Sequence, residues 1–159
     1  MGITISHSGY LRHVFRPRQL GVTVETVAMS LEAFSRRTGT RIDALAFRGF
    51  SGAGVVFPLS LRTGIPPINV RKQVEESHGM QIEGPEIEIE TFVVVDDLMS
   101  SGKTVNTIIE TLTREGLRCV GIFLYSYSSN LPAGEQVRTH FCGDTEYPVM
   151  WCGPEGYEL

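Results

Sequence analysis

Two adjacent carboxylates and a run of small, hydroxyl-bearing and cationic residues stand together in the segment FVVVDDLMSSGKTV, residues 92–105. Asp96 and Asp97 can accept hydrogen bonds from sugar hydroxyls or from waters on a metal ion. The residues that follow suit a phosphate, because glycine lets the backbone approach closely, hydroxyls donate hydrogen bonds and lysine adds a point charge. These residues are Ser100, Ser101, Gly102, Lys103 and Thr104. A ribose 5-phosphate group carries both vicinal hydroxyls and a phosphate, so the segment predicts a site for a ligand of this kind.

The flanking residues predict where this segment lies in the fold. Phe92–Val95 is a continuous apolar run rich in β-branched residues, which is typical of a buried parallel strand. After Lys103 the apolar residues have the spacing of a helix, at Val105, Ile108, Ile109 and Leu112. The loop between strand and helix therefore lies at the carboxyl end of a strand and at the positive end of a helix. Sheets of the α/β class bind phosphorylated ligands at such positions.

Two other interpretations compete for this loop. SSGKT resembles the end of the P-loop motif of nucleotide-binding proteins, but that motif requires glycine at position 97. Asp97 would project its carboxylate at the polyphosphate, which excludes the P-loop. The other interpretation is an ordinary junction, in which aspartate forms the turn and Thr104 or Ser101 caps the helix. Capping accounts for one such residue, but not for Asp-Asp followed by Ser-Ser-Gly-Lys-Thr.

Three segments carry a resemblance to a known family. VVVDDLMSSGKT closely resembles the signature with which type I phosphoribosyltransferases bind phosphoribosyl pyrophosphate (PRPP). LAFRGFSG, Leu45–Gly52, resembles the pyrophosphate loop of that family, especially the RGF form of adenine phosphoribosyltransferases. INVRK, Ile68–Lys72, resembles the strand that enters the family's mobile catalytic loop. The order and spacing fit, and the matches together cover roughly residues 40 to 125.

The resemblance implies a PRPP-dependent pentosyltransferase that moves ribose 5-phosphate to a nucleobase and releases pyrophosphate. It implies Mg²⁺ as the cofactor, PRPP and a nucleobase as the bound partners, and a homodimer. The RGF form favours a purine as the acceptor, as in nucleotide salvage. Asp96 and Asp97 would hold the ribose hydroxyls and waters on Mg²⁺, and residues 100–104 would hold the 5-phosphate.

Four further residues, three of them cationic and one a glycine, complete the implied site. Arg48 and Gly49 would contact the pyrophosphate, with glycine allowing the backbone to come close. Arg71 and Lys72 leave the next strand in the same direction and would belong to the catalytic set.

The implied fold is a central, mostly parallel sheet flanked by helices, with a small hood from the termini. The whole chain, residues 1–159, would be one domain, with a core of about 22–150 and a hood from about 1–21 and 148–159. Aromatic residues of the hood are the candidates for stacking on a flat base. Trp151 is the first of these, ahead of Tyr10, Phe15 and Tyr157.

Local patterns along the chain agree with an alternation of strands and helices. The first twenty residues, which include Pro17, are predicted to be irregular, and apolar spacing predicts a helix from Val24 to Phe34. A second helix is predicted over 51–61, and Ile87–Glu90 alternates like a half-exposed strand. The polar stretch 71–90 predicts a loop or loose hairpin over the site. Apolar runs predict the remaining strands at residues 42–47, 65–70, 92–95, 117–125 and 149–151. Such alternation indicates a parallel sheet.

Composition narrows the class of protein. An apolar fraction of 42 % and a charged fraction of 20 % are those of a globular domain. The net charge of −4, without an arginine- or lysine-rich stripe, argues against nucleic acid as the partner. We expect no membrane span and no signal peptide, because no apolar run is long enough. The three cysteines match no disulfide framework or zinc pattern, so we expect reduced thiols in a cytoplasmic protein, with His140, Cys142 and Cys152 as packing residues.

Two further functions are compatible with the same fold. A non-catalytic PRPP- or nucleotide-sensing regulator would keep the phosphate loop but alter the pyrophosphate and catalytic loops. Arg48-Gly49 and Arg71-Lys72 are both present, which favours the enzyme. A subunit of a PRPP-forming synthetase is disfavoured, because the chain is too short for two such domains.

Overall fold

A computed structural model of the chain describes residues 11, 13–72, 81–126 and 138–152. Expectations that concern other residues lie outside this range. They include the hood positions Tyr10 and Tyr157 and the part of the expected loop over the site that falls at 73–80.

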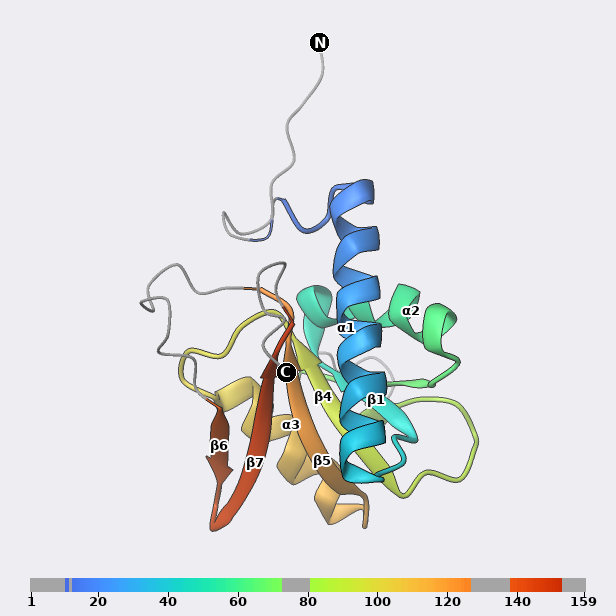
Figure 1. The fold of residues 1–159 in the computed structure, drawn as a ribbon. Helices are drawn as coiled ribbons and strands as arrows, with labels where there is room; N and C mark the ends of the chain where they lie inside the picture. The colour runs from blue at the N-terminus through green and yellow to red at the C-terminus, as the bar shows by residue number, and fades with distance from the viewer. Residues whose placement is uncertain (1–10, 12, 73–80, 127–137, 153–159) are drawn as a thin grey trace.

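A seven-stranded sheet runs through the molecule, in the spatial order β3-β2-β1-β4-β5-β7-β6 (Figure 1). Five neighbouring strands are parallel, and an antiparallel strand lies at each edge. In chain order the strands are β1 Ala44–Phe47, β2 Pro67–Val70, β3 Ile82–Glu83, β4 Thr91–Asp96, β5 Arg118–Leu124, β6 Thr139–Cys142 and β7 Thr145–Trp151. The predicted α/β class with a mostly parallel sheet is confirmed.

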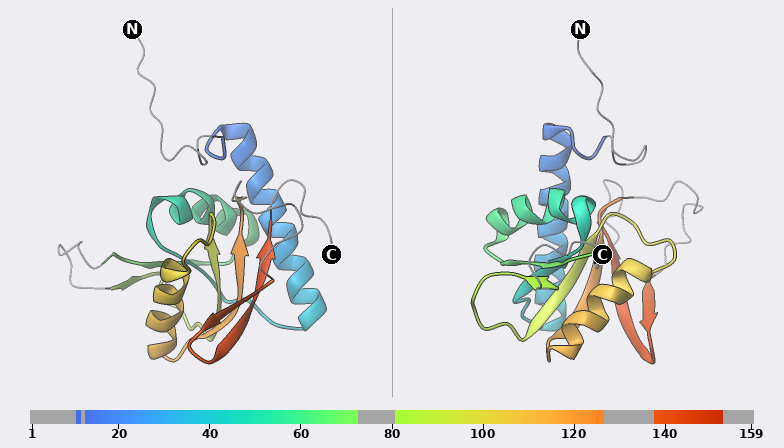
Figure 2. Two further views of the ribbon diagram at one scale, coloured as in Figure 1. Left: turned by 90° about the vertical axis from the view of Figure 1, so that its left-hand side faces the viewer. Right: turned by 180° about the vertical axis from the view of Figure 1, so that it is seen from behind.

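Helices cover both faces of this sheet (Figure 2). The three helices in the described residues are α1 Pro17–Thr38, α2 Gly49–Thr63 and α3 Lys103–Arg114. Side chains of a strand point alternately to opposite faces, and β4 divides its buried residues accordingly. Val93 and Val95 pack in the cluster with α1 and α2, whereas Phe92 and Val94 pack in the cluster with α3. A strand buried on both faces must be apolar throughout, which explains the unbroken run at 92–95.

Helix α1 begins at Pro17, so the prediction of irregular chain up to residue 20 is wrong for residues 17–20. Proline lacks the backbone N–H that the first turn of a helix leaves unpaired, and its fixed φ suits that position. Pro17 therefore starts the helix instead of preventing it. The helix ends at Gly39, which has a φ of +67° and donates its N–H to the Ser35 carbonyl.

The predicted and observed strands differ most at the two edges of the sheet. Ile87–Glu90 is not a strand, although it alternates; the strand of that region is β3, which pairs antiparallel with β2. Strands β2 and β3 thus form a hairpin that begins before residue 71, and whether it covers the site, as expected for residues 71–90, stays a prediction. Strand β6 was not predicted, because its residues Thr139–Cys142 carry no clear period and its partner β7 supplies the order. None of the helices in the described ranges has the length and apolar character needed to cross a bilayer.

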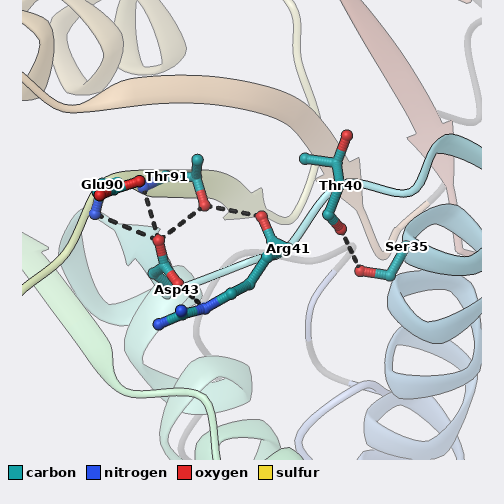
Figure 3. A network of polar contacts seen from close by, with 6 residues as sticks. All are labelled: Ser35, Thr40, Arg41, Asp43, Glu90 and Thr91. Atoms are coloured by element: carbon teal, nitrogen blue, oxygen red, sulfur yellow. Dashed lines mark hydrogen bonds and ion pairs between the residues drawn. The ribbon is translucent and has the colours of Figure 1, made fainter.

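A polar network fastens the amino ends of β1 and β4 (Figure 3). The Asp43 carboxylate accepts hydrogen bonds from the Thr91 N–H at 3.0 Å, the Thr91 hydroxyl at 3.0 Å and the Glu90 N–H at 3.2 Å. Asp43 also forms an ion pair with Arg41. These contacts hold the two strands in register at the edge of the sheet opposite their carboxyl ends.

The order of the strands places a switch point between β1 and β4. From β1 the chain crosses through α2 to β2 on one side, whereas from β4 it crosses through α3 to β5 on the other side. The two helices lie on opposite faces, so the loops after β1 and β4 diverge and leave a crevice between them. Ligands of α/β proteins bind at such a crevice.

Candidate functional site

A cavity of about 320 Å³ opens at this switch point. Its wall combines the loop after β1, the loop after β4 and the first turn of α3, with one residue from the end of β2. The lining residues are Arg48, Gly49, Phe50, Ser51, Lys72, Asp96, Asp97, Leu98, Met99, Ser100, Ser101, Gly102, Lys103, Thr104 and Val105. The volume is within the range of small-molecule sites.

The acidic pair, Asp96 and Asp97, is held by hydrogen bonds from the backbone that follows the neighbouring strand β5. The carbonyls of Asp96 and Asp97 accept hydrogen bonds from the N–H groups of Tyr125 and Ser126, at 3.1 and 2.8 Å. Each carboxylate also accepts from the next residue: Asp97 N–H donates to Asp96 Oδ1 at 2.9 Å, and Leu98 N–H donates to Asp97 Oδ1 at 2.8 Å. Both residues are buried, so their carboxylates have fixed positions in the wall of the cavity.

Burial and like charge make this pair electrostatically unfavourable without a ligand. Removal from water, and then the neighbouring Asp97 carboxylate, raise the pKa of Asp96 to about 8. A hydrogen bond from the Ser51 side chain partly opposes this rise. A hydroxyl donor or a cation in the cavity would relieve the repulsion, so the pair suits a ligand that brings either of them.

The phosphate loop, defined here as residues 100–104, leads into the amino-terminal end of α3. Gly102 occupies the N-cap position with a φ of +71°, a conformation that favours glycine. Gly102 has no side chain with which to cap the helix, and Thr104 lies inside the first turn, so the capping interpretation is wrong for Thr104. Ser101 Oγ accepts one long hydrogen bond, of 3.5 Å, from the Lys103 N–H. Ser101, Lys103 and Thr104 are exposed at the cavity. Their side chains and the free N–H groups of the first turn can bind an anion.

The loop after β1 provides the opposite wall. Gly49 has a φ of +75°, and a side chain there would meet Lys72 Cε at 3.4 Å. Lys72 therefore reaches over Gly49 from the end of β2, and the structure brings Arg48, Gly49 and Lys72 together as the sequence predicts. Three cationic residues, Arg48, Lys72 and Lys103, line the same cavity as the two carboxylates.

Two predicted site residues are not among those that line this cavity. Arg71 forms an ion pair with Glu83 of β3, with 3.2 Å between Nη1 and Oε1, and lines a second groove, to which Gly49 and Lys72 also contribute. Trp151 ends β7 and packs, partly buried, against the core on the α3 face. Phe15, a further aromatic candidate, packs on α2, with its ring 5.4 Å from that of Phe50.

Sequence reasoning missed Ser51 as a contact of the acidic pair. Its side chain hydrogen-bonds Asp96, and its carbonyl accepts a hydrogen bond of 2.6 Å from the Tyr125 hydroxyl. Its position directly after Arg-Gly-Phe could have indicated this role, because the first turn of a helix that follows a ligand-binding loop faces the same ligand.

A magnesium ion fits the chemistry of the acidic pair. Mg²⁺ prefers oxygen ligands, keeps several waters and is held by one or two carboxylates together with substrate phosphates. Asp96 and Asp97 provide carboxylate oxygens in the cavity, and their mutual repulsion would fall beside a cation.

Comparisons with known proteins agree with this geometry. A family model described as phosphoribosyl transferase domain matches residues 66–129. An orotate phosphoribosyltransferase of Listeria monocytogenes is 30 % identical over 128 residues, which are 78 % of this chain and 61 % of that protein. This chain thus spans about three fifths of the length of that curated relative.

Solved structures share the fold at low sequence identity. An adenine phosphoribosyltransferase matches with a TM-score of 0.66 at 14 % identity, over 89 % of this chain and 84 % of its own. A phosphoribosyltransferase from Corynebacterium diphtheriae matches with a TM-score of 0.62 at 20 % identity, over 93 % and 87 %. Residues 66–129 thus match a phosphoribosyl transferase domain, and the chain has the fold of solved phosphoribosyltransferases.

Proposed function

We propose that this chain transfers the ribose 5-phosphate group of PRPP to a nucleobase and releases pyrophosphate. One observation carries the proposal: the acidic pair, the phosphate loop and the cations Arg48 and Lys72 line a single cavity. PRPP needs each of these groups, because it carries vicinal hydroxyls between a 5-phosphate and a pyrophosphate.

The residues can be assigned to the parts of PRPP. The N–H groups and hydroxyls of residues 100–104 would bind the 5-phosphate, with Lys103 as the counter-charge. Asp96 and Asp97 would accept hydrogen bonds from the ribose hydroxyls. Arg48, Gly49 and Lys72 would face the pyrophosphate on the opposite wall.

The reaction requires positioning and charge stabilisation more than covalent chemistry by the protein. A ring nitrogen of the base forms a bond to the anomeric carbon, and the bond from that carbon to the pyrophosphate oxygen breaks with its electron pair. The base gives up its N–H proton to water. Positive charge grows on the ribose beside Asp96 and Asp97, and negative charge grows on the pyrophosphate beside Arg48 and Lys72.

Bound Mg²⁺ would supply charge neutralisation at the pyrophosphate and would orient the ribose hydroxyls. Asp96 and Asp97 would hold it through the hydroxyls of PRPP and through water. We therefore expect PRPP binding to depend on Mg²⁺, with no binding of comparable strength in excess chelator.

Two classes of acceptor have support. The RGF form at residues 48–50 supports a purine, and a structural relative is named as an adenine phosphoribosyltransferase. The curated Listeria relative is named as an orotate phosphoribosyltransferase, which supports a pyrimidine. The resemblance also supports a homodimer, which sedimentation of the purified protein tests directly.

Pyrophosphate release measured with PRPP, Mg²⁺ and each of adenine, guanine, hypoxanthine and orotate tests the proposal. We expect release with one of these bases and none without a base. PRPP binding, followed by calorimetry, without release for any base would identify a PRPP sensor and overturn the enzymatic proposal.

A further inference from the structure

An imidazole from the edge strand β6 lies directly on the glycine of the phosphate loop. A side-chain carbon built on Gly102 would come within 2.7 Å of His140 Cε1 and 3.3 Å of Nε2. Gly102 is buried even though Ser101 and Lys103 on either side of it are exposed. The ring of His140 therefore leaves room for a glycine only.

The same imidazole is fixed by a side chain of α3. His140 Nε2 lies 2.6 Å from Asn106 Oδ1, close enough for the ring N–H to donate to the amide oxygen. The Asn106 backbone N–H donates in turn to the Gly102 carbonyl at 2.8 Å. Gly102, Asn106 and His140 thus form a closed triangle of one packing contact and two hydrogen bonds.

A second contact shows that β6 follows α3 in register. Cys142 Sγ lies 3.9 Å from Glu110 Oε1, one helical turn beyond Asn106. Two residues of a strand advance about 6.6 Å, and four residues of a helix advance about 6 Å. The spacings match, so His140 and Cys142 meet successive turns of α3, but only His140 meets the phosphate loop.

We propose that His140 is a positioning residue for the phosphate loop, a role that rests on the proposed function of the cavity. By covering Gly102 and binding Asn106, it holds Gly102 in its left-handed conformation, with a φ of +71°. That conformation turns the chain from the loop into α3 and sets the direction of the N–H groups at Ser101–Thr104. His140 does not contact the ligand; it sets the geometry of groups that do.

The His140 ring acts on the phosphate loop through its shape and its hydrogen bond, and not through charge. Burial lowers the pKa of His140, so the ring is neutral near pH 7 and adds no charge to the phosphate site. Its contribution is shape and one hydrogen bond. Positioning groups matter because small displacements of ligand contacts weaken binding and catalysis.

The test compares His140→Ala with Cys142→Ala, a matched variant of the same strand and the same helix, one turn away from the loop. We expect His140→Ala to weaken binding of inorganic phosphate, and to raise the KM for PRPP, by about fivefold. Its kcat and its KM for the base should change less than twofold. Cys142→Ala should leave all of these values within twofold of the native protein.

Two further variants separate positioning from folding. His140→Gln keeps an amide donor for Asn106 Oδ1 and should restore most of the phosphate affinity. Asn106→Ala should reproduce the loss, and the double variant with His140→Ala should be no worse than either single change, because both remove the same contact.

Hydrogen exchange reports on the loop without any ligand. The Asn106 amide should exchange faster in His140→Ala than in Cys142→Ala, because its acceptor at Gly102 is released. If the Asn106 amide exchanges faster in His140→Ala but the native protein binds no phosphate, the positioning role is supported and the phosphate site is overturned. Unchanged exchange and equal phosphate binding in His140→Ala and the native protein would overturn the positioning role while leaving the proposed function intact.

Discussion

The Tyr125 hydroxyl donates a hydrogen bond of 2.6 Å to the Ser51 carbonyl, although the two residues are 74 positions apart in the chain. Tyr125 follows the last residue of β5, and Ser51 lies in the first turn of α2. The bond ties the wall of the cavity that carries Arg48 to the strand that fixes the acidic pair. It is therefore a link between the two loops that the proposed reaction must keep at a constant separation.

Tyr125→Phe removes this link without changing the volume of the ring. We expect a loss of about 1 kcal/mol in the free energy of unfolding, because one buried hydrogen bond is removed. The KM for PRPP should rise severalfold, since the first turn of α2, which carries Ser51, can move away from Asp96. Urea unfolding and initial rates measure the two effects. An unchanged KM would show that the loop after β1 is held by other contacts.

Asp96→Asn should increase stability in a pH-dependent way. The pKa of Asp96 is raised to about 8 from 3.8, so between these values the folded protein binds more protons than the unfolded chain. Native stability therefore falls as the pH rises from about 4 to about 8. Asparagine cannot ionise, so the variant should be more stable at pH 8 by on the order of 5 kcal/mol, against about 1 kcal/mol at pH 4.5.

Urea unfolding at both pH values measures this difference. Asp144→Asn, an exposed change in the turn between β6 and β7, is the control and should follow the native protein throughout. If the free energies of unfolding of Asp96→Asn and the native protein differ by the same amount at both pH values, the pKa of Asp96 is not raised.

Asp97→Asn should abolish turnover, because in the proposed reaction the ribose needs the negative charge of this carboxylate and not only its volume. The change is nearly isosteric, so the fold should survive, as circular dichroism can verify. Rates of pyrophosphate release should fall by at least about 100-fold, whereas Asp144→Asn keeps the native rate. Native turnover in Asp97→Asn would remove this residue from the site.

Gly49→Ala and Gly64→Ala form a matched pair for the loop after β1. Both glycines have a φ near +75°, at +75° and +73°, and each change to alanine should cost about 1 kcal/mol of stability. Only Gly49 lies under Lys72; nothing surrounds the position of a side chain at Gly64. The KM for PRPP should therefore rise in Gly49→Ala alone. A similar rise in both variants would indicate general destabilisation.

Lys103→Ala should weaken PRPP binding with a smaller effect on the affinity for the base. Lys103 is exposed at the cavity in the first turn of α3, so a loss of about fivefold to tenfold is expected. Arg114→Ala, in the last turn of the same helix, is the control for helix stability. Calorimetric titrations with PRPP and with the accepted base distinguish the two affinities. Equal weakening of both would point to a structural role.

Local patterns were sufficient to predict β4, the loop after it and α3. The apolar run 92–95, the acidic pair and the spacing after Lys103 each depend on neighbours in the chain. A short edge strand such as β6 has no such signal, because its order comes from pairing with β7. Proline misled the prediction at residue 17, since its effect depends on whether it lies at the start of a helix or inside it.

The sequence by itself determined which groups could bind a ribose phosphate, because residue types and their spacing set the donors, the charges and the flexible glycine of one loop. Only the tertiary structure decided which distant residues join that loop. Parallel pairing of β1 with β4 brings Arg48 and Ser51 to the acidic pair, whereas Arg71 pairs with Glu83 instead. His140 reaches Gly102 because an antiparallel edge strand runs along α3. Contacts between separate elements follow from strand order and packing, which no local pattern encodes.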